Sequence, residues 1–151
     1  MRKTTILAML LSALPFTAQA QSVRQVFQEF GLIGVWARAC DLPPSVEDGN
    51  SHVIYALASG RGDGVMLTYD NGPGYNASVY SILSAERAGR DRLTYLEERL
   101  HDKKRVTVTV LKNDNEISLW SSVLPDGTVL VRDGRHTANG AANPRQVRCA
   151  K

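Results

Sequence analysis

The sequence contains none of the short motifs that mark common catalytic or cofactor sites. It has no G-x-S-x-G elbow for a serine nucleophile and no glycine-rich phosphate loop between a strand and a helix. The three histidines, His52, His101 and His136, lack the spacing of a helical zinc site. Glu97 and Glu98 are neighbours on a predicted strand, so their side chains point to opposite faces and that spacing does not make them a paired acid and base. We therefore expect no catalytic residue, metal or cofactor, although residues far apart in the sequence can still converge into an active site.

The chain also lacks a marked excess of charge of either sign. It carries 18 lysines and arginines against 15 aspartates and glutamates, and two of the cations, Arg2 and Lys3, lie in a segment that we expect to be removed. A nearly neutral domain has no general electrostatic attraction for nucleic acids or anionic lipids. The charge balance therefore argues against a nucleic-acid partner.

No hydrophobic run reaches the roughly eighteen residues that a transmembrane helix needs. The first apolar run, residues 6–14, follows Arg2 and Lys3 and precedes the small-residue box at residues 18–20. This order of features is typical of a secretory signal peptide. We predict that residues 1–20 are cleaved after Ala20, and that residues 21–151 form a single domain without a transmembrane segment. The mature protein is expected to be periplasmic or secreted in a bacterium.

Cysteine is scarce, since Cys40 and Cys149 are the two in the chain. In an oxidising compartment an isolated pair is most simply one disulfide, and two cysteines allow one pairing. Neither cysteine has a histidine or another cysteine nearby at ligand spacing, which argues against a metal-binding or catalytic thiol. We predict a disulfide that ties the first strand to the last.

The spacing of the apolar residues changes once along the chain. Between residues 22 and 31 they recur at helical spacing, which predicts a short N-terminal helix. Later segments alternate apolar and polar residues, most clearly at residues 105–111, and tight turns separate them. No later stretch is long enough for the helical crossover that parallel strands need. We predict an all-β fold: an antiparallel meander that forms a closed or nearly closed barrel of about eight strands, with a two-sheet β-sandwich as the alternative.

The first predicted strand opens with Gly34-Val35-Trp36. A G-x-W opening that follows a short helix and leads into a meander resembles that of lipocalin-type barrels, in which the tryptophan plugs the closed end. The wider layout resembles small secreted bacterial proteins of uncharacterised activity. The shared features are an export signal, G-x-W-x-x-x-C followed by prolines, a strand like residues 80–87, a hairpin with two D-G pairs and a terminal cysteine. This resemblance implies a barrel and an exported location, and it implies no activity.

The first function that we expect is that of a non-catalytic binding module, which holds an unidentified, partly apolar small molecule in the barrel mouth. The candidate ligand contacts are Trp36, Arg38, Tyr55, Met66, Tyr80 and Trp120. Trp36 and Arg38 share a strand face, so we also expect the guanidinium of Arg38 to stack on the indole. Filling the core is the simpler role for Trp36.

The alternative function is a protein–protein interaction, for example that of a periplasmic inhibitor or an envelope assembly factor. A rigid scaffold that carries variable loops suits this role. It predicts an exposed apolar patch, for instance where Val23, Phe27 and Phe30 of the helix fail to bury.

Overall fold

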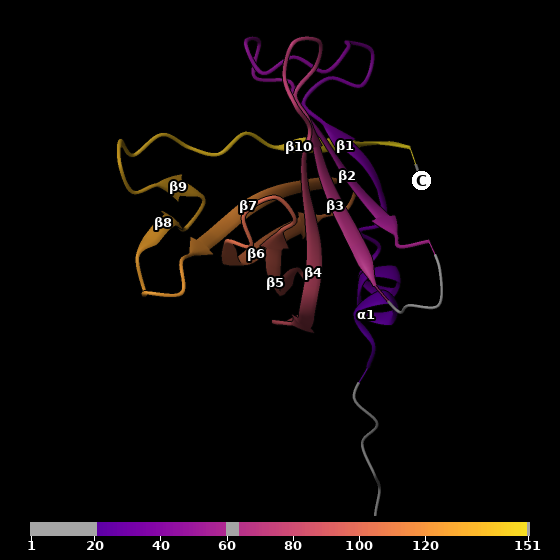
Figure 1. Ribbon diagram of the computed structural model, residues 1–151, viewed down its shortest axis with the longest axis vertical. Coiled ribbons are helices and arrows are strands. Elements are labelled where there is room, and N and C mark those ends of the chain that lie inside the picture. Colours follow the sequence, from indigo (N-terminus) through magenta and orange to yellow (C-terminus); the bar gives the residue numbers. More distant parts are fainter. Residues whose placement is uncertain (1–20, 60–63, 151) are drawn as a thin grey trace, which may run out of the picture.

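Residues 21–59 and 64–150 are described by a computed structural model of the chain (Figure 1). The leader predicted over residues 1–20 lies outside the described residues. Helix α1 (Val23–Phe30) begins after Ser22, whose hydroxyl accepts a hydrogen bond from the Gln25 amide, and it ends at Gly31 in the left-handed conformation. The predicted N-terminal helix is confirmed.

Ten strands follow α1 in the described part of the chain. They are β1 (Gly34–Ala37), β2 (His52–Leu57), β3 (Val65–Asp70), β4 (Ser78–Arg87), β5 (Arg92–Arg99), β6 (Arg105–Asn113), β7 (Glu116–Val123), β8 (Val129–Arg132), β9 (Arg135–His136) and β10 (Gln146–Ala150). Consecutive strands from β1 to β9 pair antiparallel, and β10 pairs with both β1 and β7. These pairings close β1 to β7 and β10 into an eight-stranded barrel, while β8 and β9 lie outside it. The predicted antiparallel barrel is confirmed, and the sandwich alternative is wrong.

Alternation along the strands separates an apolar interior from a polar exterior. On β5, Leu93, Tyr95 and Glu97 are buried, whereas the intervening side chains are half-buried. The outward Thr94 of β5 and Thr109 of β6 share a hydrogen bond of 2.9 Å between their hydroxyls. The period of two therefore fixes which side chains enter the barrel.

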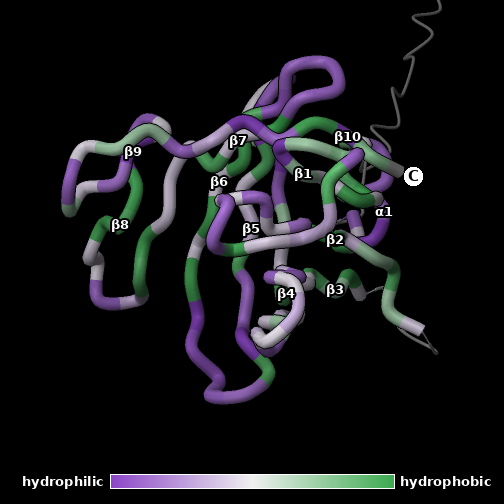
Figure 2. Tube along the Cα trace, turned by 90° about the horizontal axis from the view of Figure 1, so that it is seen from above, coloured by the Kyte–Doolittle hydropathy of each residue, from purple (hydrophilic) through white to green (hydrophobic). Residues whose placement is uncertain are grey.

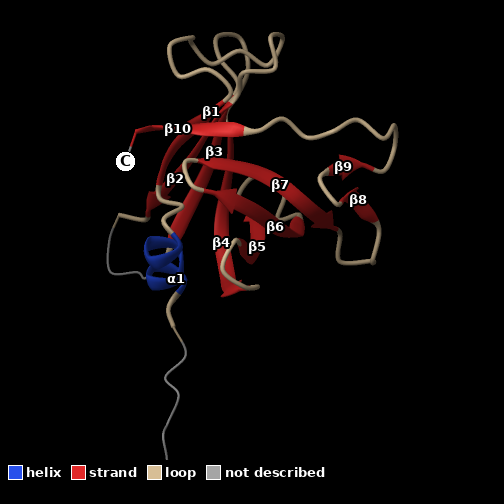
Figure 3. Ribbon diagram, turned by 180° about the vertical axis from the view of Figure 1, so that it is seen from behind, coloured by secondary structure: helices blue, strands red, loops and turns tan. Residues whose placement is uncertain are grey.

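The helix α1 closes one end of the barrel, and the long loops 38–51 and 71–77 extend from the opposite end (Figures 1 and 3). Phe27 is fully buried, Val26 and Phe30 nearly so, and Val23 packs against the same core. The apolar face of the helix therefore stabilises the barrel and leaves no patch there for a partner protein, contrary to one form of the protein-interaction expectation.

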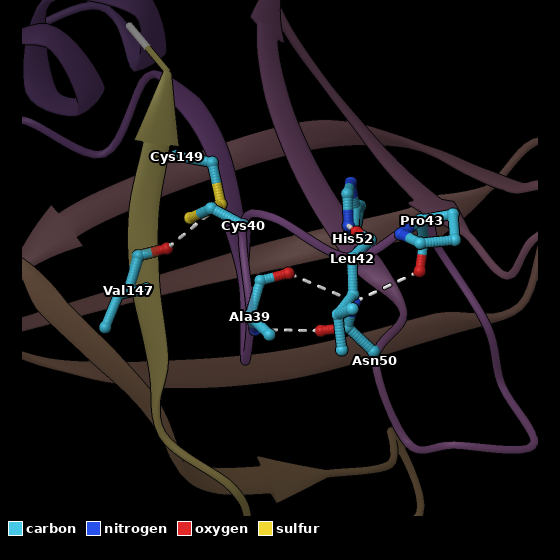
Figure 4. Close-up of a disulfide and its surroundings, with 8 residues drawn as sticks. All are labelled: Ala39, Cys40, Leu42, Pro43, Asn50, His52, Val147 and Cys149. Atoms are coloured by element: carbon cyan, nitrogen blue, oxygen red, sulfur yellow. Dashed lines mark hydrogen bonds between the residues drawn. A yellow bond between two sulfur atoms is a disulfide. The ribbon is translucent and has the colours of Figure 1, made fainter.

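The predicted disulfide between Cys40 and Cys149 is present (Figure 4). Their Cα atoms lie 5.2 Å apart, and the bond joins β10 to the segment that follows β1, beside the seam where these strands pair. The hydrophilic turn between β5 and β6, residues 101–104, projects from the barrel (Figure 2). Within the described residues, no helix combines the length and the hydrophobicity needed to cross a membrane.

Candidate functional site

Trp36 belongs to the packed core at the start of the barrel wall. Its side chain is fully buried, and its indole N–H donates a 2.8 Å hydrogen bond to the carbonyl of Leu32. The guanidinium that stacks on the indole is that of Arg148, 4.3 Å from the ring centroid. Arg148 also donates hydrogen bonds to the carbonyls of Gly31 and Ile33, so one cation joins β10, the indole and the segment between α1 and β1.

The predicted stacking of Arg38 on Trp36 is therefore wrong. Strand β1 ends at Ala37, so Arg38 lies outside the sheet. The alternation of side chains between the two faces of β1 therefore does not extend to Arg38. Arg38 is exposed and donates instead to the carbonyls of Asp48 and Gly49, at 3.3 and 3.5 Å. It organises a loop, whereas Trp36 fills the core.

A cavity of about 140 Å³ is lined by inward-facing side chains of the barrel, two of which, Tyr55 and Tyr95, also contact Phe27 of α1. Its lining combines tyrosine rings and aliphatic side chains with polar residues of β7, of β10 and of the segment before β10. The lining residues are Val53, Tyr55, Tyr69, Tyr95, Val110, Ile117, Ser118, Leu119, Asn143, Pro144 and Gln146. An engineered protein cavity of about 150 Å³ binds benzene, whereas drug-sized ligands occupy about 300–1,000 Å³. The interior therefore has room for a very small molecule.

Tyrosine hydroxyls give this cavity its polar character. The Tyr55 and Tyr95 hydroxyls share a 2.9 Å hydrogen bond, and the ring of Phe27 packs against both rings, with centroids 5.7 and 5.4 Å away. Tyr69 meets Tyr80 edge to face at 5.6 Å. Burial raises the pKa values of Tyr55, Tyr69 and Tyr95 well above their ordinary range. These hydroxyls therefore stay neutral and can both donate and accept hydrogen bonds.

Glu97 adds a carboxylate to the inward face of β5, although it does not line the cavity. It follows Tyr95 on the same inward face of β5, it is 5% exposed, and its Oε2 atom has no hydrogen-bond partner among the described residues. Its cross-strand neighbours are the apolar Ile82 of β4 and Val106 of β6. Burial raises the pKa of Glu97 to about 7, because the ionised form loses its hydration. The Glu97 charge in turn contributes to the raised pKa values of the tyrosines.

The adjacent Glu98 shows the opposite environment. It lies on the outer face, where Arg105 binds it at 2.9 Å and Lys103 at 3.6 Å, and the hydrogen bond from Arg105 lowers its pKa. The sequence prediction that the two carboxylates point to opposite faces is consistent with this arrangement. The sequence analysis did not identify Glu97 as a site residue. Its position in the alternating series Leu93, Tyr95, Glu97 was the signal that could have identified it as an inward-facing residue.

The remaining predicted ligand contacts do not gather at the cavity. Tyr55 lines it, and Tyr80 packs beside it against Tyr69. Met66 lies between the buried Val65 and Leu67 and so faces outward. Trp120 lies on the outer face beneath the guanidinium of Arg92, 4.5 Å from the ring centroid, and lines a second hollow of about 210 Å³.

The two hollows meet at the segment that precedes β10. Asn143 lines both of them, and its side-chain nitrogen has no hydrogen-bond partner among the described residues. Arg145 of the same segment forms an ion pair with Glu116 of β7, with 3.2 Å between a guanidinium nitrogen and the carboxylate oxygen Oε2. This strap before β10 is held by the exposed ion pair together with a 2.8 Å backbone hydrogen bond from the Asn143 amide to the Gly134 carbonyl and the pairing of Gln146 with Ile117.

The loops at the end away from α1 form a second structured region. Asn50 is buried and holds the loop 38–51 from within, because its side chain accepts from the Ala39 amide and donates to the Ala39 and Pro43 carbonyls (Figure 4). The loop 71–77 is joined to it by hydrogen bonds from the Val46 amide to Asn71 and from the Tyr75 hydroxyl to Glu47. Three large apolar side chains of these loops are exposed: Leu42, Val46 and Tyr75.

In the described part of the chain, no group of three or more histidine, cysteine, aspartate or glutamate side chains is arranged to hold a metal ion. Comparison with known proteins identifies no matching family model, no matching curated protein and no matching solved structure.

Proposed function

We propose that the protein is an exported, non-catalytic binding protein whose barrel interior holds a very small, partly apolar molecule. The observation that carries the proposal is the cavity of about 140 Å³, whose walls are tyrosine rings and aliphatic side chains. Barrel interiors of this strand number hold one small ligand when side chains do not fill them completely. The disulfide suits an oxidising compartment, and the lipocalin-like opening at Gly34-Val35-Trp36 is in keeping with a ligand-holding barrel.

The size of the cavity limits the ligand to about the size of a single substituted aromatic ring. The hydroxyls of Tyr55 and Tyr95 offer polar contacts inside, while Val110 and Leu119 offer apolar ones. Long-chain lipids and drug-sized molecules exceed this volume. Benzyl alcohol, which has one ring and one hydroxyl, is therefore a suitable neutral probe.

Isothermal titration of benzyl alcohol into the mature protein tests the proposal. We expect saturable binding with one site, which the substitution Leu119→Trp abolishes because the larger ring occupies the cavity. The matched control is Leu83→Trp, which places the same ring at an exposed position of β4. Absence of saturable binding to the unmodified protein, or equal loss in both variants, would contradict the proposal.

The interlocked loops 38–51 and 71–77 favour a second candidate function, which is the docking of a partner protein in the cell envelope. Leu42 is 52% and Tyr75 50% exposed, although hydrogen bonds hold both loops in place. A pre-organised surface loses little conformational entropy when it binds. Native mass measurement of protein isolated gently from its own host distinguishes the two functions: a small excess mass supports the cavity ligand, and a protein-sized excess that Leu42→Asp removes supports docking.

A further inference from the structure

The second hollow, which we call the outer hollow, is a separate space from the cavity inside the barrel. Its volume is about 210 Å³, and it is lined by β6, β7, the turn between β8 and β9 and the segment before β10. Strands β8 and β9 lie beside β7 but outside the barrel (Figure 1). Trp120 lines the outer hollow and not the inner cavity, whereas Leu119 lines the inner cavity and not the outer hollow. The two spaces can therefore be altered independently.

Backbone hydrogen bonds hold the walls of the outer hollow in place. The Gly134 amide donates to the Trp120 carbonyl at 2.8 Å, and the Asn143 amide donates to the Gly134 carbonyl at 2.8 Å. Gly134 has a φ of +72 to +73°, a left-handed conformation that favours glycine, and its position lies close to the indole ring of Trp120. Because main-chain groups fix this arrangement, the side chains of Trp120 and Asn143 are free to contact a ligand.

One polar group in this lining is unused. The side-chain nitrogen of Asn143 is buried and has no hydrogen-bond partner among the described residues. A buried donor without a partner lowers stability, and native proteins retain few such groups. Asn113 also presents an amide to the outer hollow, and no hydrogen bond from its side chain to another described residue is found. Two side-chain amides are therefore available to a ligand in this space.

The charges in the lining cancel. Glu116 and Arg145 are its charged residues, and they pair with each other at 3.2 Å with 41% and 76% of their side chains exposed. The lining therefore has no net charge to attract an ion. Asn113, Ser118 and Asn143 can each donate and accept hydrogen bonds, while an indole and two aliphatic side chains supply apolar surface. This combination suits a neutral molecule that carries several hydroxyl groups on an apolar frame.

We propose that the outer hollow binds one pyranose unit of a neutral sugar, with its C–H groups against the Trp120 indole and its hydroxyls toward Asn113 and Asn143. The C–H hydrogens of a sugar ring carry a small positive charge, and the face of an aromatic ring is negative. Arg92 lies over the indole, 4.5 Å from the ring centroid, but does not line the hollow, so it positions the ring without occupying the site. The volume exceeds that of a cavity that holds benzene, and it suits a single sugar ring. This inference does not rest on the proposed function.

Nuclear magnetic resonance of the mature protein tests the inference through the two indole N–H signals. The probes are the methyl β-glycosides of glucose, galactose and N-acetylglucosamine. We expect at least one of them to shift the Trp120 signal saturably, with a dissociation constant on the order of 1 mM. The signal of Trp36, whose buried indole N–H is bonded to the Leu32 carbonyl, should stay in place. Sorbitol, a linear polyol without a ring, should bind at least about tenfold more weakly.

Substitutions locate the sugar. Asn143→Ala and Asn113→Ala should each weaken binding at least about threefold, because each removes one hydrogen bond to a hydroxyl. Asn76→Ala is the matched control, since it removes an exposed amide from the loop 71–77 and should leave the affinity unchanged. Leu119→Trp, which fills the inner cavity, should also leave the affinity unchanged.

The contrary outcomes are distinct from those for the inner cavity, which benzyl alcohol tests. Absence of a saturable Trp120 shift with all three glycosides overturns the inference, as does equal binding of sorbitol. Equal weakening by Asn143→Ala and Asn76→Ala assigns the effect to the surface in general, and loss of binding in Leu119→Trp assigns it to the inner cavity. Either result overturns the inference. If Asn143→Ala does not fold, Asn113→Ala decides, because that side chain is exposed and lines the outer hollow without lining the inner cavity.

Discussion

The two halves of the barrel interior differ in what fills them. Near α1, the interior consists of fully buried apolar side chains such as Phe27, Leu32 and Leu93. The buried indole of Trp36 donates a hydrogen bond to the Leu32 carbonyl, and the guanidinium of Arg148 stacks on its ring. The other half contains a cavity of about 140 Å³, which is lined by Tyr55, Tyr69 and Tyr95, and the carboxylate of Glu97, which lies on the same inward face of β5 as Tyr95 but does not line the cavity. The same eight strands therefore build a packed half and a hollow half.

The comparison indicates which part of the interior lowers the free energy of unfolding. Close packing and apolar burial are the main favourable contributions to folding, so the packed half needs no other explanation. Cavities and unpaired buried charges reduce stability, and natural proteins retain them chiefly where function requires them. The hollow half is accordingly the part of the interior that we connect with binding.

The largest expected loss of stability concerns the seam between β1 and β10, which the disulfide crosslinks. The double substitution Cys40→Ser with Cys149→Ser removes a crosslink between residues 109 apart in the sequence. Chain-entropy arguments predict a loss of about 4 to 5 kcal/mol in the free energy of unfolding. Denaturant titration followed by circular dichroism measures this loss. An unchanged midpoint would mean that the β10–β1 seam closes equally well without the bond.

The same truncation in each half tests the comparison directly. Leu93→Ala in the packed half should lower the free energy of unfolding by about 3 to 4 kcal/mol, because a fully buried leucine leaves a new cavity. Leu119→Ala should cost about 1 to 2 kcal/mol, because Leu119 is partly exposed and already borders a cavity. Equal losses in urea titrations of the two variants would remove the distinction between the halves.

The pH dependence of stability tests the cost of Glu97. The folded carboxyl retains its proton up to about pH 7, whereas the unfolded chain releases it near the ordinary value of 4.5. Stability from this residue is therefore present below about pH 4.5 and is lost as the pH rises to about 7, by roughly 3 kcal/mol in total. Glu97→Gln should match the unmodified protein near pH 4.5 and be the more stable of the two by about that amount at pH 8. If the free energies of unfolding of the two proteins differ by a constant amount from pH 4 to pH 8, ionisation of Glu97 does not lower the stability of the hollow half.

Residue patterns predicted the β architecture better than they predicted the interior. Alternation in residues 105–111 and the tight turns led to an antiparallel barrel, because the period of two is a local property of each strand. The partner of Trp36 is not local: Arg148 arrives from β10, and no pattern near residue 36 indicates it. The small volume of the cavity is equally non-local, since it depends on how far Phe27 of α1 enters the barrel and meets Tyr55 and Tyr95.

Candidate ligand contacts chosen by residue type alone were scattered for the same reason. Met66 and Trp120 are large and apolar, but their register places them on the outer face. Tyr55 lines the cavity because β2 alternates between buried and half-buried positions and places Tyr55 inward. The alternation of β5 places Glu97 on the inward face. The sequence analysis missed it because it did not expect a charged residue on that face.

The smallest expected effect distinguishes the hydroxyls of the hollow half from its rings. Tyr55→Phe removes one partner of the 2.9 Å hydrogen bond and leaves the buried Tyr95 hydroxyl without it, which should lower the free energy of unfolding by about 1 kcal/mol. Tyr69→Phe is the matched control, because it deletes the hydroxyl of a half-buried tyrosine for which no hydrogen bond to another described side chain is found. It should therefore change stability by less than Tyr55→Phe. Urea titrations of both variants at pH 5, where Glu97 is protonated, isolate the hydroxyl contribution from that of the charge. A greater loss for Tyr69→Phe would mean that the polar atoms of this half are organised around Tyr69, and the Tyr55–Tyr95 pair would then not be its centre.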